Sequence, residues 1–268
     1  MNLSIRLPLL VLLPLTVLVG SASAQDASVP KHLQLARDFV ANTKQENNSY
    51  SNTHIYTRMP GDLFASEYVV ATDCGGFVED MFRRAKSGVL EQLKTKKFKN
   101  RFSIFDWHPS IVKEEAFTRI RKVPDIQPGD VAVWLYMNMG THTLPGHMLF
   151  IDSAPVKLEK PRKPVVAGLD QYEVSIIDTS QEAKSRDDTR YVSDAALRDE
   201  NEAKGKERGS IASPNYKGVG RGHIRFYADA TGDIKGIAYG FDKAKFHGLD
   251  DWNIVVGRPR LVALGGKP

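Results

Sequence analysis

The chain has little cysteine: Cys74 is the single one among its 268 residues. One cysteine cannot form an intrachain disulfide, and it excludes cysteine-rich zinc sites, iron–sulfur clusters and disulfide-stapled scaffolds. No His-Glu-x-x-His segment is present either, so the sequence predicts no metal site and no cofactor. The chemistry of this one thiol is therefore the first question that the sequence raises.

A strong excess of one charge is also missing. The formal net charge is +5, which suits an acidic polymer but is too weak to indicate a nucleic-acid partner. Hydrophobic residues make up 41% and charged residues 26% of the chain. This balance excludes a disordered, a collagen-like or a polytopic membrane protein and is ordinary for a globular one.

Long apolar runs are absent after the first 20 residues. Residues 7–20 are apolar and uncharged, Arg6 precedes them, and Ala22-Ser23-Ala24 follows as a small-x-small cleavage pattern. The run is short for a membrane span, which needs about 20 residues, so an uncleaved anchor is the weaker alternative. The sequence predicts a signal peptide over residues 1–24 and a periplasmic or secreted protein with no stable membrane insertion after cleavage.

The hydrophobic pattern predicts helices first and strands later. Apolar residues at helical spacing predict helices over residues 32–44, 74–85 and 110–122, with a loop over 47–60. Strands are expected at 131–136, 147–151, 172–178 and 253–256, with a hairpin at 222–227 and 234–239. Residues 181–209 are rich in charge and predict a solvated loop with a helical piece near 193–202. This order predicts an α+β fold in one domain over residues 25–268, with a core at about 31–180 and the strands of 222–258 completing or extending its sheet.

Cys74 stands at the start of the second predicted helix, in the segment Asp73-Cys74-Gly75-Gly76-Phe77-Val78. Thr72 and Asp73 are good N-cap residues, and the helix dipole at this end favours a thiolate. The two glycines leave the backbone open to a substrate. The alternative is an inert buried thiol, since free cysteine is among the most buried residue types.

A thiolate nucleophile needs a base, and the base needs a group that orients it. His147 lies at the start of an apolar strand, and Asp178 ends the next strand. Taken alone, His147 is also explained as a histidine at the edge of a sheet, and Asp178 as an aspartate that forms a turn. His142, in the loop before His147, is an alternative base. Trp134 is expected in the core or lining a cleft. The glycines between Gly218 and Gly222 lack the strand and helix that flank a phosphate-binding loop.

Four segments, in order, resemble the NlpC-type cell-wall cysteine peptidases, a papain-like superfamily. These are an Asp-Cys-Ser-Gly-Phe-Val-like helix start (residues 73–78), a Pro-Gly-Asp turn before a strand (126–134), a His-led strand (146–151) and a polar residue on the next strand (174–178). The resemblance covers roughly residues 66–180. It implies a papain-like NlpC-type fold, in which N-terminal helices pack on a small antiparallel sheet.

The resemblance also implies roles. Cys74 becomes the nucleophile, His147 the general base and then acid, and Asp178 the orienting group; Asp73 becomes a candidate for binding a substrate amine. Gly75 stands where the family has serine, and the family tyrosine upstream of the nucleophile has Tyr56 and Tyr68 as candidates. Gly75, Tyr68 and Trp134 join Asp73 as expected substrate-binding residues.

The implied activity is cleavage of an amide bond, with peptidoglycan stem peptides as the expected substrate because of the exported location. Two other function classes stay open. One is an inactive module that binds wall peptides, and the other is an amidase, acyltransferase or toxin on the same scaffold. The sequence gives no oligomeric state.

Overall fold

The computed structural model describes residues 29–93, 101–137, 145–185, 187–192, 217–239 and 244–262. The predicted signal peptide, His142 and the helical piece at 193–202 lie outside these residues. Strands make up 40% of the molecule and helices 22%. None of the helices in the described ranges is both long and apolar enough to cross a membrane.

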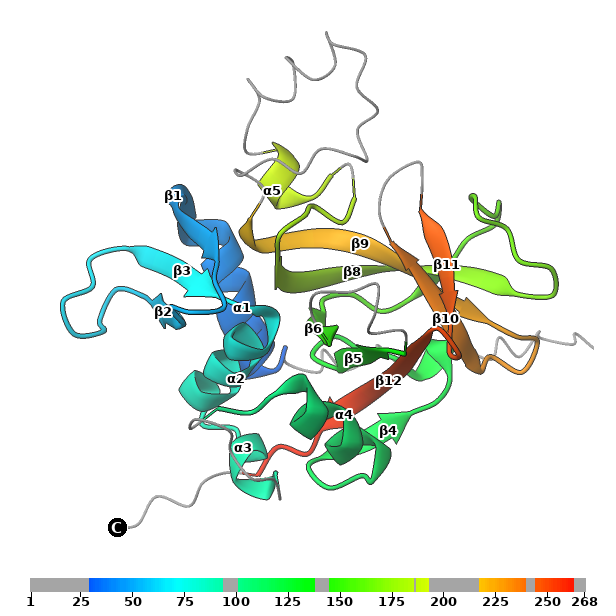
Figure 1. Ribbon diagram of the computed structural model, residues 1–268, viewed down its shortest axis with the longest axis horizontal. Coiled ribbons are helices and arrows are strands. Elements are labelled where there is room, and N and C mark those ends of the chain that lie inside the picture. Colours follow the sequence, from blue (N-terminus) through cyan, green and yellow to red (C-terminus); the bar gives the residue numbers. More distant parts are fainter. Residues whose placement is uncertain are drawn as a thin grey trace, which may run out of the picture.

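A large antiparallel sheet dominates the fold and curls into a half-barrel (Figure 1). The long strands β8 and β9 pair over their whole length, from Asp170 opposite Ala228 to Ser180 opposite Gly218. The strand order is β11-β10-β9-β8-β6-β5-β12-β4, with the short β7 paired to β8. Its strands are β4 (Phe117–Ile120), β5 (Val131–Tyr136), β6 (Gly146–Ile151), β7 (Val156–Lys157), β8 (Asp170–Ser180), β9 (Gly218–Ala228), β10 (Ile234–Tyr239), β11 (Lys245–Gly248) and β12 (Trp252–Pro259).

A second, three-stranded sheet lies near the amino terminus. Its central strand β3 (Tyr68–Thr72) pairs in parallel with β1 (Thr43–Tyr50) and antiparallel with β2 (Tyr56–Arg58). β3 leads directly into the helix that carries Cys74, so this small sheet fixes where that helix begins.

In the described ranges, five helices accompany the sheets, together with a 3₁₀ turn over Val123–Asp125. Helix α2 is held at both ends: the Asp73 side chain accepts a hydrogen bond from the Gly76 N–H, and Lys86 closes the helix in a left-handed conformation. In Figure 1 α1, α2 and α4 lie together on one side of the sheet, and α5 lies next to β9. The helices are α1 (Lys31–Asn42), α2 (Cys74–Ala85), α3 (Val89–Gln92), α4 (Ile104–Val112) and α5 (Thr189–Val192).

The two faces of the main sheet bury separate cores. Alternation along β5 sends Val131 and Val133 to the face covered by the helices, and Ala132 and Trp134 to the opposite face. The helical face is packed with aromatic rings, among them Phe82, which stacks on a tryptophan of α4. The opposite face is closed by the curl of the sheet upon itself, which a small flat sheet could not achieve.

The expected fold class is therefore wrong. The sheet is not a small one covered by N-terminal helices; it is a curled half-barrel that supplies most of the molecule. The predicted helix over 110–122 is also wrong, since α4 starts at Ile104 behind a capping box of Ser103 and Asp106 and ends at Val112. The apolar residues that follow belong to β4, because Phe117 and Ile120 pair with β12.

Most other elements follow the sequence pattern. The helix at 74–85 and the strand at 131–136 are confirmed at their predicted bounds. The hairpin of β9 and β10 is confirmed with a longer first arm, and its second arm has the predicted bounds. The predicted loop over 47–60 contains instead the end of β1 and the whole of β2. β1 has no apolar periodicity (Thr-Lys-Gln-Glu-Asn-Asn-Ser-Tyr) and is a strand through its pairing with β3.

Candidate active site

Cys74 is the first residue of α2, which places its side chain at the positive end of a 12-residue helix. The Asp73 side chain accepts a hydrogen bond from the Gly76 N–H, and the Asp73 carbonyl oxygen accepts one from the Phe77 N–H. The first turn of a helix has no intrahelical acceptors for its leading N–H groups, so those of Cys74 and Gly75 point outward. Cys74 is a free, partly exposed thiol.

His147 and Asp178 meet where two strands of the main sheet separate. The β6–β8 ladder has two residue pairs, Phe150 with Ile177 and Ile151 with Ile176, and it stops there. Beyond it the side chains bridge the strands: His147 Nε2 lies 2.6 Å from Asp178 Oδ2. The Asp178 side chain is fully buried and that of His147 is 10% exposed. The carboxylate thus fixes the ring, and Nδ1 is the nitrogen left for Cys74.

The charges around His147 stabilise its imidazolium form. Burial by itself lowers the pKa of His147, but the negative charge of Cys74 and the hydrogen bonds to Asp178 and Cys74 outweigh it and raise the pKa to about 9. The predicted base, orienting carboxylate and thiol therefore interact directly.

A buried arginine stands behind Asp178. Arg190 Nη2 on α5 lies 2.8 Å from Asp178 Oδ1 and 2.7 Å from Asp188 Oδ2, and its side chain is 1% exposed. Burial would raise the pKa of Asp178, but the charge of Arg190 and then the hydrogen bond from His147 hold it below its ordinary range. Arg190 therefore keeps the Asp178 carboxylate ionised although its side chain is fully buried.

The glycines of β9 make room for this ion pair. A side chain on Gly220 would begin 2.4 Å from Arg190 Nε, and one on Gly222 would begin 2.5 Å from Asp188 Oδ2. Arg190 also donates a hydrogen bond to the Gly218 carbonyl. The glycine-rich segment of β9 thus makes room for Arg190, which lies behind Asp178.

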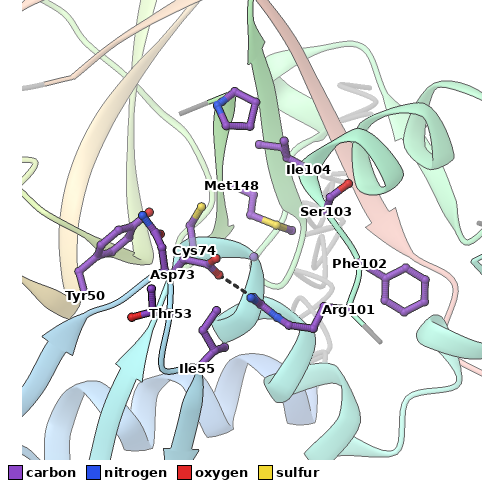
Figure 2. Close-up of a pocket in the computed structure, with 14 residues that line it drawn as sticks. Tyr50, Thr53, Ile55, Asp73, Cys74, Arg101, Phe102, Ser103, Ile104 and Met148 are labelled. Carbon is purple, nitrogen blue, oxygen red and sulfur yellow. Dashed lines mark hydrogen bonds and ion pairs between the residues drawn. The ribbon is translucent and has the colours of Figure 1, made fainter. Parts of the chain in front are cut away.

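Cys74 opens into a cavity of about 780 Å³ (Figure 2). Asp73, Cys74 and Gly75 form one edge, as their predicted roles require, and Arg101 reaches in to the Asp73 carboxylate. The described lining is otherwise polar but uncharged, or apolar: Tyr50, Asn52, Thr53, Ile55, Phe102, Ser103, Ile104, Pro145, Gly146 and Met148. The cavity is large enough for several residues of a peptide.

Tyr50, which the sequence did not single out, is the tyrosine at this site. It lines the cavity from the end of β1, and burial followed by the negative charges of Cys74, Asp73 and Asp178 raises its pKa, so its hydroxyl stays protonated. Tyr68 packs edge-on against Phe39 and Tyr56 is 44% exposed on β2, and neither is among the described residues lining the cavity. Tyr50 was missed because its strand shows no apolar period.

Trp134 lies behind the site rather than in the cavity. It is fully buried, its ring centre is 5.1 Å from that of His147, and it stacks on Trp252 of β12 at 5.5 Å. His247 of β11 stacks in turn on Trp252 at 3.7 Å. Trp134 thus contacts the His147 ring and belongs to the core. The described residues contain no group of three or more His, Cys, Asp or Glu side chains placed to hold a metal ion.

Comparison with known proteins gives one distant relative to report. An uncharacterized protein of Acanthamoeba polyphaga mimivirus is 27% identical over 199 residues, which are 71% of this chain and 78% of the viral protein. No protein-family model matches the chain, and no solved structure matches it.

Proposed function

We propose that the protein is a cysteine hydrolase that cleaves an amide bond with Cys74, His147 and Asp178. The observation that carries the proposal is the contact of His147 with both partners: 2.6 Å to Asp178, and a hydrogen bond to Cys74 at the start of a helix that faces a cavity. This is the geometry that a thiolate nucleophile requires. The sequence resemblance to NlpC-type peptidases supports the same roles.

In the first half of the reaction, the Cys74 thiolate attacks the amide carbonyl carbon. The negative charge that develops on the carbonyl oxygen is stabilised by the outward N–H groups of Cys74 and Gly75, with the Tyr50 hydroxyl close by. His147 gives its Nδ1 proton to the leaving nitrogen as the carbon–nitrogen bond breaks. The amine departs, and the acyl group remains on sulfur as a thioester.

In the second half, neutral His147 takes a proton from water while the water oxygen attacks the thioester. The carbon–sulfur bond breaks, the acid product leaves, and the thiolate–imidazolium pair is restored. Asp178 does not change its protonation state, because Arg190 stabilises its charge throughout. It holds the imidazole in place and stabilises its positive form.

The substrate class that we propose is the stem peptide of peptidoglycan. Its support is the predicted signal peptide, which would take the protein out of the cytoplasm, and the resemblance to wall peptidases. The cavity of about 780 Å³ is large enough for such a peptide. A relative in a virus of an amoeba says nothing about this substrate.

Digestion of purified peptidoglycan tests the activity and the substrate together. We expect the native protein to release new muropeptides, identified by mass spectrometry, and Cys74→Ala and His147→Ala to release none. Trp252→Phe, which keeps an aromatic ring in the stack behind His147, is a control that should retain cleavage. Absence of any Cys74-dependent product would contradict the wall-hydrolase proposal.

Thiol alkylation tests the nucleophile without a substrate. At pH 6 an ordinary thiol, with a pKa of about 8.5, is almost wholly protonated. Cys74 should therefore react with iodoacetamide at least about tenfold faster than a free thiol, and His147→Ala should remove the difference. A rate equal to that of a free thiol would favour the inactive binding module.

A further inference from the structure

The carboxylate beside the nucleophile is already paired with a cation of the chain itself. Asp73 Oδ1 accepts hydrogen bonds from the Gly76 N–H at 2.7 Å and from Arg101 Nη2 at 2.8 Å (Figure 2). A substrate amine that approached Asp73 would meet the positive guanidinium next to it. The charge at this corner of the cavity therefore does not favour a cationic substrate.

Gly76 is what allows Arg101 to approach. A side chain at this position would begin 2.7 Å from Arg101 Nη2 and 2.3 Å from Thr72 Oγ1. Glycine inside the first turn weakens a helix, because its backbone loses more freedom than that of other residues. Gly75, one residue earlier, has no neighbour closer than 3.7 Å to such an added atom. Of the two glycines, Gly76 is thus the one whose missing side chain leaves space for the Arg101 guanidinium.

Arg101 retains hydrogen-bonding capacity that the cavity can use. A guanidinium has five N–H donors in a planar fork, and in the described part of the chain its ionic partner is Asp73, reached through Nη2. The side chain is 33% exposed and lines the cavity. Among the described lining residues, Asp73 and Arg101 are the side chains of fixed charge, and Asp73 Oδ1 already accepts two hydrogen bonds, one of them from Arg101.

We propose that Arg101 binds a carboxylate of the substrate, so that the amide bond cleaved at Cys74 belongs to an acidic peptide. This inference rests on the proposed function, since it places the acidic group in the same cavity as the nucleophile. Arginine pairs with a planar carboxylate through two parallel hydrogen bonds, which fixes the orientation of the ligand as well as its charge. The apolar side chains of Ile55, Ile104 and Met148 suit the aliphatic part of such a peptide.

Two alkylating reagents of nearly equal size test the proposal. Iodoacetate carries a carboxylate and iodoacetamide does not; with either, the Cys74 sulfur forms a bond to carbon and iodide leaves. The ratio of the two rates reports on the charge next to the thiol. We expect Arg101→Gln to lower the iodoacetate-to-iodoacetamide ratio about tenfold, as for the loss of a hydrogen bond between charged groups. Arg101→Lys, which keeps the charge but not the fork, should give an intermediate ratio.

Arg83→Gln is the matched control, because it removes one positive charge from α2 at a side chain that lines the neighbouring cavity instead. Its ratio should stay within about twofold of the wild type, since an exposed charge at a distance is screened. An unchanged ratio in Arg101→Gln, or an equal fall in Arg83→Gln, would overturn the inference. Lack of reaction of Cys74 with both reagents in the native protein would instead contradict the proposed function.

A measurement on the native protein keeps the test independent of how the variants fold. At constant ionic strength, succinate should slow the alkylation of Cys74 by iodoacetamide, and succinamide at the same concentration should not. Equal protection by both compounds, or by neither, would argue against a carboxylate site at Arg101.

Discussion

At the scale of single residues, the contacts of His147 determine which protonation states the site can adopt. Burial lowers the pKa of His147, but its interactions with Cys74 on one side and with the buried carboxylate of Asp178 on the other outweigh this effect and raise the pKa to about 9. Asp178 in turn depends on Arg190, a residue 12 positions further along the chain. The candidate site is thus a series of interacting side chains that runs from Cys74 through His147 and Asp178 to Arg190. The sequence motifs contain all of these except Arg190.

We expect Asp178→Asn to lower the pKa of His147 from about 9 by roughly one to three pH units, because the negative partner is lost while burial remains. The asparagine still offers an oxygen to Nε2, so the ring should keep its place. An NMR titration of the imidazole C–H signals measures this directly. Asp187→Asn, which removes the partner of the half-buried His223, serves as the control and should leave the titration of His147 unchanged.

The burial of His32 should make the folded protein less stable in acid. It is buried on α1 with Nε2 2.9 Å from the Gly129 carbonyl, and desolvation lowers its pKa to about 4. The unfolded chain takes up this proton near pH 6.5 and the folded protein does not, so stability is complete above pH 6.5 and falls as the pH drops toward 4. The expected contribution is about 3 kcal/mol.

Urea unfolding of the native protein and His32→Gln, each at pH 7 and pH 4.5, separates this residue from other acid effects. The native protein should lose more stability between the two pH values than the variant does. An equal loss in both would show that His32 is not the group responsible.

At the scale of elements, helix α2 and strand β5 could be predicted because their signals are local. A capping aspartate, a stripe of apolar residues and a Pro-Gly-Asp turn each lie within a few residues of the element they define. Strands β1 and β4 could not, since β1 is polar and β4 carries a helical spacing. Both are strands because of partners far away in the sequence, β3 and β12.

The same difference explains what could be predicted of the site. Cys74, His147 and Asp178 each lie in a short motif, whereas Tyr50, Arg101 and Arg190 reach the site by contacts that no local pattern encodes. Tyr50 comes from a strand with no apolar period. Arg190 lies in the charge-rich stretch over residues 181–209, which the sequence predicts as a solvated loop. Buried and solvated charged residues cannot be told apart in such a stretch from the sequence alone.

The two glycines at the start of α2 should respond oppositely to substitution. Gly75→Ala places its methyl group 3.7 Å or more from its neighbours and should stabilise the helix by about 0.5–1 kcal/mol. Gly76→Ala would begin 2.3 Å from Thr72 Oγ1 and should destabilise by about 1–3 kcal/mol. Thermal unfolding of both variants tests this contrast. Equal effects would contradict the packing described for Gly76.

Arg190 links α5 to the strands β8 and β9, and its removal should cost more than that of a surface arginine. Arg190→Met leaves Asp178 and Asp188 buried without their shared cation, for which we expect a loss of about 3–5 kcal/mol. Arg260→Met, at an exposed pair with Glu114, should change stability by less than about 1 kcal/mol. Urea unfolding at pH 7 gives both values, and wild-type stability in Arg190→Met would refute this role.

At the scale of the whole molecule, the last described strand, β12, joins β4 to the rest of the main sheet. β12 lies between β5 and β4, with Trp252 opposite Tyr136 and Val256 opposite both Ala132 and Ile120. Its first residue, Trp252, stacks on Trp134, which contacts the ring of His147. The extent of this sheet could not be predicted from the sequence, since it depends on pairing residues more than 100 positions apart.

A chain that ends at Asp251 should therefore lose both cooperative folding and the reactivity of Cys74. Without β12, the buried edges of β5 and β4 have unpaired backbone groups, and the core on the side of Trp134 is opened. A chain that ends at Val262 keeps every described strand and is the control. Near-ultraviolet circular dichroism during urea unfolding, together with iodoacetamide alkylation at pH 6, measures the two effects. If the shorter chain unfolded in one sharp transition and kept a fast thiol, β12 would not be needed to complete the fold or to hold His147 in place.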